Sequence, residues 1–311
     1  MLQIQTGQRI GTYRVTGFLG RGAFAQVHLA EGLDGRTVAL KVGDQSGGGR
    51  LLERFPDVTD ERSPAQVSPD ECPAEALFLD PAHGARPEML DAAEVDELLE
   101  REAELLAHAS GGPVPELYDV IRPEGRPVLV MEHVPGRTLR QRIRSLEGVR
   151  LRWLDAVCDA LGELRDLGWS CHGDLKPENV MVTDDDRVVL LDPLPENVHD
   201  DRIVATPSYN PFLRWDEKGD VHAVAIVLYE LLGCCLPFPR TPWPHAGIQS
   251  PHLDEEQRRL ALSLYLSYVP LRELNPLTPR ELEAIVHSAL CDPDYGLDEL
   301  ARELHAFVAL A

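Results

Sequence analysis

Four polar side chains in the middle of the sequence have the types and spacing that phosphoryl transfer requires. The run CHGDLKPENVMV places Asp174, Lys176 and Asn179 within six residues, and Asp192 follows at the end of the apolar run VVLL. A carboxylate can act as base for a hydroxyl, and a lysine can neutralise a moving phosphoryl group. Amide and carboxylate oxygens are ligands that magnesium accepts. The segment therefore predicts phosphoryl transfer from ATP.

Two earlier features could hold the phosphates of a nucleotide. The glycine turn LGRGAFAQV, from Leu19 to Val27, would let backbone amides approach a polyphosphate. Lys41 stands on the strand directly after that hairpin, and its ammonium needs a carboxylate partner. Glu102 and Glu104 are both available on the next helix. Helical geometry places Glu102 on one face with apolar Leu106, which favours Glu102.

The first part of the chain is predicted to be rich in strands. Residues 13–42 alternate apolar and polar side chains and are broken by Gly20, Gly22 and the Asp34-Gly35 turn, which predicts three antiparallel strands. A stretch rich in Pro, Ser, Asp and Glu predicts an insertion over about residues 43–90. The further elements expected here are a helix over residues 91–109 and strands over 117–122 and 127–132.

The second part of the chain is predicted to be mostly helical. Pro135-Gly136 breaks the chain after the last of these strands. Helical periods follow over residues 139–143, 151–167 and 221–232, interrupted by a short β-rich piece over 180–191. This order predicts an α+β fold of two lobes, with residues 10–134 in the first lobe and 135–311 in the second.

Charge and cysteine content restrict the class of protein. Lys and Arg number 30 against 52 for Asp and Glu, and the formal net charge of −22 repels nucleic acid and anionic lipid. The six cysteines lack CxxC pairs and zinc-type spacing, so we expect mostly buried, reduced thiols. The start of the sequence lacks the pattern of a signal peptide, and we expect a cytoplasmic protein without membrane or nucleic-acid partners.

Taken in order, these motifs resemble the eukaryotic-like (Hanks-type) serine/threonine protein kinase family, as a divergent bacterial member. The resemblance implies a two-lobed protein-kinase-like fold, ATP and Mg²⁺ as cofactors, and protein substrates with Ser or Thr acceptors. The net charge of −22 adds the expectation of an acidic face that recruits basic peptides. The implied catalytic residues are Asp174, Lys176, Lys41, Glu102 and Thr206. The implied ATP-binding residues are Leu19, Gly20, Gly22, Val27, Ala39, Lys41, Met131, Glu132, Val134 and Met181. The implied magnesium ligands are Asn179 and Asp192. Asp220 is expected to brace the catalytic loop.

Several positions depart from the family pattern. Gly173 stands where many members carry an arginine that a phosphorylated activation loop engages, so we expect a site that assembles without loop phosphorylation. Pro193-Leu194 replaces Phe-Gly after Asp192, which should restrict movement of this motif. The family's Ala-Pro-Glu reads Pro211-Phe212-Leu213, and its usual arginine partner is missing from residues 291–296.

Two other functions fit parts of the pattern. His-Gly-Asp-Leu followed by Asn also resembles the antibiotic phosphotransferases, which act on small molecules, although Lys176-Pro177-Glu178 and the Thr206 loop argue against them. Pro193 and the long insertion would suit a nucleotide-binding interaction module without turnover. Retention of Asp174 argues against that reading, because a scaffold has no need of a catalytic base. The oligomeric state and the physiological substrate are not determined by the sequence.

Overall fold

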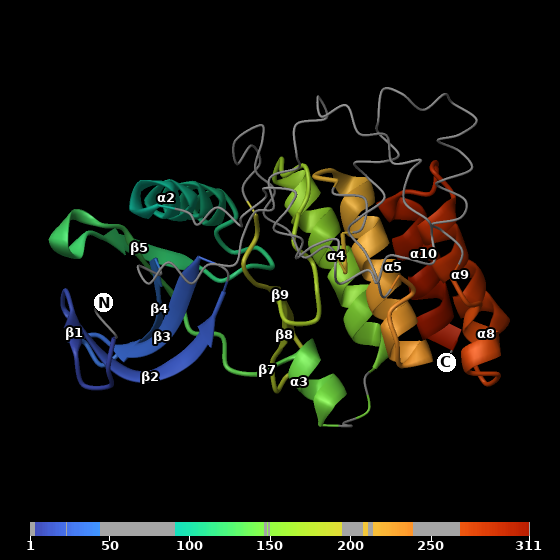
Figure 1. Ribbon diagram of the computed structural model, residues 1–311, viewed down its shortest axis with the longest axis horizontal. Helices are drawn as coiled ribbons and strands as arrows, with labels where there is room; N and C mark the ends of the chain where they lie inside the picture. Colours follow the sequence, from blue (N-terminus) through green and yellow to red (C-terminus); the bar gives the residue numbers. More distant parts are fainter. Residues whose placement is uncertain are drawn as a thin grey trace, which may run out of the picture.

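The computed structural model describes residues 4–22, 24–43, 91–145, 148, 150–194, 208–210, 214–238 and 268–310. It joins a six-stranded antiparallel sheet to a group of helices, with a small three-stranded sheet between them (Figure 1). The α+β class predicted from the sequence is confirmed. The predicted insertion of residues 43–90 lies almost wholly outside the described residues, as does Thr206.

The large sheet has the strand order β1-β2-β3-β4-β6-β5. Its strands are β1 (Arg9–Ile10), β2 (Tyr13–Arg21), β3 (Ala25–Glu31), β4 (Thr37–Gly43), β5 (Leu117–Ile121) and β6 (Val128–Glu132). Strand β4 pairs with β3 on one side and β6 on the other, so it is central. Because side chains alternate between the two faces of β4, Val38 and Leu40 pack into one apolar cluster, whereas Ala39 packs into the main core on the opposite face. Lys41 therefore shares the face of Ala39.

Helix α2 (Ala92–His108) packs across β4, β5 and β6. Asp91 caps it, accepting from the amides of Ala93 and Glu94, while the Glu94 side chain returns to the Asp91 amide. Its buried stripe consists of Val95, Leu98, Leu99, Glu102, Ala103 and Leu106. Glu102 is thus held on the apolar face by helical periodicity.

The small sheet, β7 (Arg137–Thr138), β8 (Val180–Val182) and β9 (Val188–Leu190), lies between the large sheet and the helices (Figure 1). The chain enters it through Gly136, where a Cβ atom would lie 2.5 Å from the carbonyl oxygen of Val182. Only glycine permits this approach. Helix α3 (Leu139–Arg144) begins directly afterwards, capped by Thr138.

The helical part is built around α5 (Glu217–Gly233), which is buried along most of its length. Around it lie α4 (Leu151–Asp166), α8 (Leu271–Leu274), α9 (Arg280–Cys291) and α10 (Leu297–Leu310) (Figure 1). One continuous core runs from α2 through β9 into these helices. The residues of the small sheet are therefore supported from both sides.

Some predictions from the sequence need correction. Strands β1 and β7 were not predicted, because two residues leave no readable period. Gly20 does not end its strand but lies inside β2, which continues to Arg21. The expectation of mostly buried cysteines is wrong for the described ones: Cys158 is buried, whereas Cys234 and Cys235 are exposed just after α5. None of the described helices is long and apolar enough to cross a membrane.

Candidate active site

A cleft of about 1290 Å³ lies between the large sheet and the helical part. All of the described residues assigned to the site from the sequence line it: Leu19, Gly20, Gly22, Val27, Ala39, Lys41, Glu102, Met131, Glu132, Val134, Asp174, Lys176, Asn179, Met181 and Asp192. Thr206 lies outside the described residues. Side chains far apart in the sequence, such as Lys41 and Asp192 at a separation of 151 positions, are therefore gathered around one cavity.

A buried ion pair crosses from the sheet to helix α2. The Lys41 ammonium lies 2.6 Å from Glu102 Oε1 and 2.7 Å from Asp192 Oδ1. The side chains of Lys41 and Glu102 are 4% and 2% exposed, whereas Asp192 is 42% exposed toward the cleft. Glu104 is exposed, so the preference for Glu102 over Glu104 as the partner is confirmed.

Burial and charge act in opposite directions on these three groups. Burial alone would lower the pKa of Lys41, but the carboxylates of Asp192 and Glu102 outweigh it and hold that pKa above its usual range. Burial would raise the pKa of Asp192, and the Lys41 ammonium instead holds it below its usual range. Burial raises the pKa of Glu102 to about 7 against the effect of Lys41. Lys41 therefore stays a cation.

The loop between α4 and β8 brings three polar side chains together. Lys176 Nζ donates to Asp174 Oδ2 over 2.5 Å. The Asn179 amide nitrogen donates to the Asp174 carbonyl oxygen over 2.9 Å and to Asp174 Oδ2 over 3.2 Å. Because the Asn179 nitrogen is engaged in this way, its side-chain oxygen remains the atom with which Asn179 could bind a cation.

Helix α5 braces this loop from behind. The buried Asp220 carboxylate accepts from the backbone amides of His172, over 2.6 Å, and Gly173, over 3.1 Å. The bracing predicted for Asp220 is confirmed. Gly173 has φ +82°, a conformation that glycine adopts without strain. A Cβ at this position would also lie 3.2 Å from Leu194 Cβ, so an arginine is disfavoured here by backbone and neighbour alike.

The Asp192 segment is tied to the same loop. The Leu191 amide donates to the Asn179 carbonyl over 2.8 Å, and the Leu194 amide donates to the His172 carbonyl over 2.9 Å. Asp192 itself has φ +52°, which is uncommon for a residue other than glycine and costs about 1 to 3 kcal/mol. Hydrogen bonds on both sides hold this strained backbone, which aims the carboxylate at Lys41.

His172 is neutral in this setting. Its ring is fully buried, and its Nε2 lies 3.0 Å from the Leu191 carbonyl oxygen, to which it must donate. Burial lowers the pKa of His172 to about 4, although Asp174 and the Leu191 carbonyl act against this. A neutral imidazole adds no charge beside Asp174.

The inner end of the cleft is suited to a flat apolar ring. Ala39 and Met131 come from the sheet and face the main core, and Met181 comes from β8 on the opposite side. The Glu132 amide donates to the Glu116 carbonyl over 2.8 Å, which leaves the Glu132 carbonyl and the Val134 backbone as candidate contacts for a heterocycle. This end could therefore hold a nucleobase, with Lys41 farther along the cleft.

Among the cleft residues that the motif analysis did not assign to the site are Phe24, Arg140 and Arg144. Phe24 lies with its ring centroid 5.5 Å from Lys41 Nζ, a cation–π contact that helps hold the ammonium. Arg140 and Arg144 of α3 line the outer end. A sequence signal for the last two existed, since residues 137–152 hold six arginines in an acidic chain.

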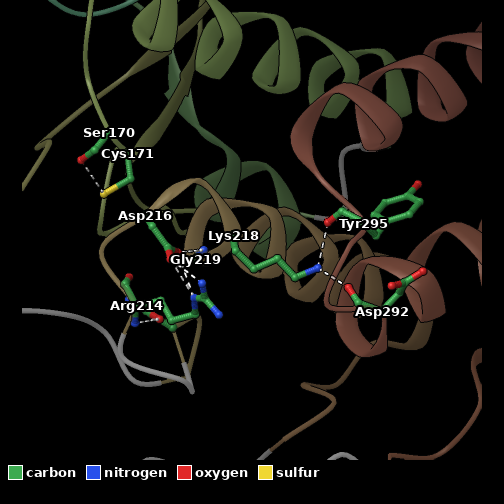
Figure 2. Close-up of polar contacts among 9 residues, drawn as sticks. Ser170, Cys171, Arg214, Asp216, Lys218, Gly219, Asp292 and Tyr295 are labelled. Atoms are coloured by element: carbon green, nitrogen blue, oxygen red, sulfur yellow. Dashed lines mark hydrogen bonds and ion pairs between the residues drawn. The ribbon is translucent and has the colours of Figure 1, made fainter.

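The start of α5 is tied to the turn between α9 and α10 by Lys218. Its ammonium donates to the Asp292 carbonyl over 2.5 Å and to the Tyr295 carbonyl over 2.8 Å, while Arg214 lies against Asp216 (Figure 2). Residues 291–296 lack the arginine of the family pattern, and Lys218 holds this turn instead.

The sequence of the chain is similar to those of known protein kinases. The family model described as protein kinase domain matches residues 88–264, which is more than half of the chain. CBL-interacting protein kinase 4 of Oryza sativa is 26% identical over 250 residues, covering 74% of this chain and 46% of its own length. Serine/threonine-protein kinase Pkn1 of Myxococcus xanthus is 26% identical over 252 residues, covering 75% of this chain and 30% of its own length. The chain thus spans less than half of these relatives.

The same fold occurs in a solved structure. The kinase domain of PknI from Mycobacterium tuberculosis superimposes with a TM-score of 0.59 at 20% sequence identity. The match covers 97% of this chain and 99% of that one. The two-lobed architecture predicted from the sequence is therefore confirmed at the level of fold.

Proposed function

The chain belongs to the protein kinase family, and from that premise we propose that it transfers the γ-phosphate of ATP to serine or threonine hydroxyls of protein substrates. The observation that carries the proposal is the meeting of Lys41, Glu102, Asp174, Asn179 and Asp192 on one cleft. Curated relatives named as serine/threonine kinases support the choice of acceptor.

The residues of the cleft fit ATP with magnesium. No cluster of three His, Cys, Asp or Glu side chains able to hold a metal occurs among the described residues. Magnesium commonly binds through one or two protein oxygens together with substrate phosphates, which the Asp192 carboxylate and the Asn179 side-chain oxygen would provide. When bound with ATP, it would neutralise charge on the phosphates during transfer.

The remaining roles follow from position and charge. Lys41 would bind the phosphates and stay oriented by Glu102, and the turn at Gly20 and Gly22 would cover them with backbone amides. Asp174 would accept the proton of the acceptor hydroxyl. Lys176, 2.5 Å from Asp174, would stabilise charge on the transferred group. These groups act by positioning and electrostatics rather than by covalent chemistry.

We further propose that this geometry does not depend on phosphorylation of the activation segment. Gly173 supplies no cation for a phosphate to engage, and the loop is held by Asp220 and by the Leu194–His172 hydrogen bond. Treatment of the purified protein with a phosphatase should leave its initial rate unchanged. A rate that falls and returns after incubation with ATP would contradict this proposal.

The function is tested with γ-labelled ATP, Mg²⁺ and a degenerate peptide library with a central Ser or Thr, reading labelled peptides by mass. We expect labelling by the wild type and a loss of about 10²- to 10⁴-fold in Asp174→Asn, since removal of a catalytic base has effects of this order. Asp298→Asn, an exposed carboxylate on α10, is the matched control. ATP binding without labelled peptide would refute protein kinase activity.

A further inference from the structure

Arg140 of helix α3 bridges two carboxylates at the outer end of the cleft. Its Nε lies 2.7 Å from Glu178 Oε1, and its Nη1 lies 2.6 Å from Glu230 Oε1. The Tyr209 hydroxyl contacts the same guanidinium and donates to Glu230 Oε2 over 2.6 Å. The three partners belong to the catalytic loop, to α5 and to the segment before α5, so no single element accounts for the cluster.

The cluster has the chemistry of a cation-binding subsite. Two carboxylates and a phenol oxygen converge on one planar guanidinium, whose fork of donors matches carboxylate geometry. The side chains of Arg140 and Glu230 are each 15% exposed, and that of Glu178 is 44% exposed. If Arg140 were absent, the two carboxylates would offer the same contacts to an arginine or lysine from outside.

The position of the cluster places it beside the phosphoacceptor. Glu178 follows Asp174 by four residues in the same loop, and both line the cleft. The Arg140 amide donates to the Pro177 carbonyl over 2.9 Å, which fixes the start of α3 against this loop. A peptide whose hydroxyl reaches Asp174 must therefore pass close to the Arg140 cluster.

Helix α3 adds further positive charge on the same wall. Arg144 lies one helical turn after Arg140, lines the cleft and is exposed, with no hydrogen bond or ion pair to the residues that the structure describes. Lys176, which donates to Asp174, also lines the cleft. The outer end of the cleft is thus not acidic, although the whole chain carries a net charge of −22.

We propose that Arg140 is a specificity-determining residue. Its guanidinium occupies the subsite in which the Glu178 and Glu230 carboxylates would otherwise bind a cation of the substrate, and it so excludes basic side chains next to the phosphoacceptor. This inference rests on the proposed function and names its substrate class: proteins with neutral or acidic residues flanking the acceptor. It replaces the expectation of basic substrates drawn from net charge, because the carboxylates that would bind them are already occupied.

The test measures peptide binding by fluorescence anisotropy, which does not depend on turnover. Two labelled nonapeptides with a central Ser are compared, one with Arg and the other with Gln at the two positions on each side. The proteins are the wild type, Arg140→Gln, Arg140→Lys and the double variant Arg140→Gln/Glu230→Gln. Arg165→Gln is the matched control, because Arg165 also bridges two carboxylates, Glu217 and Asp298, but lies outside the cleft.

Arg140→Gln should shift the ratio of affinities by about tenfold toward the Arg peptide, as expected for one new charge-assisted hydrogen-bonded pair. The double variant should lose most of that shift, and Arg140→Lys and Arg165→Gln should keep the wild-type ratio. Salt at about 0.15 M limits long-range attraction to about 8 Å. An unchanged ratio in folded Arg140→Gln would overturn the proposal.

The wild type alone provides a result that does not depend on any variant folding. Tighter binding of the Arg peptide than of the Gln peptide by the wild type would overturn the proposal, and equal or weaker binding supports it. Phosphorylation of the same peptides is read separately. Peptides that bind with the expected ratios but receive no phosphate would refute kinase activity and leave the role of Arg140 in peptide selection standing.

Discussion

Removal of the Lys41 ammonium should expose the cost of the buried Glu102 carboxylate. In Lys41→Met, Glu102 keeps its place on the apolar stripe of α2, at 2% exposure, but loses the cation 2.6 Å away. Breaking a buried ion pair by deleting one partner costs about 3 to 5 kcal/mol. We expect this loss in the free energy of unfolding at pH 8.5.

The sign of the pH dependence follows from the pKa of Glu102. Burial raises this pKa to about 7 in the wild type, and loss of Lys41 must raise it further. A carboxyl whose pKa is higher in the folded than in the unfolded state stabilises at low pH and loses that stabilisation as pH rises through the folded pKa. In the wild type, this loss of stability with rising pH is complete above about pH 7. In Lys41→Met, the free energy of unfolding continues to fall above pH 7, by about 1.4 kcal/mol per pH unit.

The assay is urea unfolding followed by circular dichroism between pH 5 and 8.5. From pH 7 to 8.5, Lys41→Met should lose about 2 kcal/mol relative to the wild type. The double variant Lys41→Met/Glu102→Gln should remove this slope, because its amide does not titrate. The exposed pair Arg14–Glu31 is the control, and Arg14→Met should change stability by less than about 1 kcal/mol. Equal pH slopes for Lys41→Met and the wild type would refute the reasoning.

Three further predictions concern helix α5 and are checked by the same unfolding measurements. Asp220→Asn should lower the free energy of unfolding by about 2 kcal/mol and lower activity, because the new side-chain NH₂ group would face one of the two backbone amides that now donate to the carboxylate. An unchanged free energy of unfolding would contradict the bracing role. Lys218→Met should cost about 1 to 3 kcal/mol by releasing the carbonyls of Asp292 and Tyr295, and an unchanged midpoint would show that this contact adds nothing. Burial, helped by nearby Lys218 and Arg214, lowers the pKa of His222 to about 3, so the unfolded state takes up more protons below pH 6.5. The contribution of His222 to the free energy of unfolding should therefore fall by about 2 kcal/mol from pH 6.5 to 5, so the difference between the wild type and His222→Phe should change by that amount over this range; identical pH slopes for the two proteins would contradict it.

Much of the site was predictable because its signals are local. The spacing of Asp174, Lys176 and Asn179 holds within one loop, and strand alternation places Lys41 on the face of Ala39. The choice of Glu102 over Glu104 followed from helical periodicity alone. These relations need only a few residues of chain, so they can be read before any tertiary contact is known.

Only the tertiary structure decided which distant groups pair with Arg140 and Lys218. Arg140 finds Glu178 and Glu230 at separations of 38 and 90 residues, and Lys218 reaches carbonyls more than 70 residues away. Nothing in the residue types distinguishes Arg140 from its five neighbouring arginines, because pairing depends on how α3 packs against the catalytic loop and α5. The sequence by itself thus determined most of the elements and the order of the kinase motifs, while packing determined that Arg140 of the same chain neutralises Glu178 and Glu230.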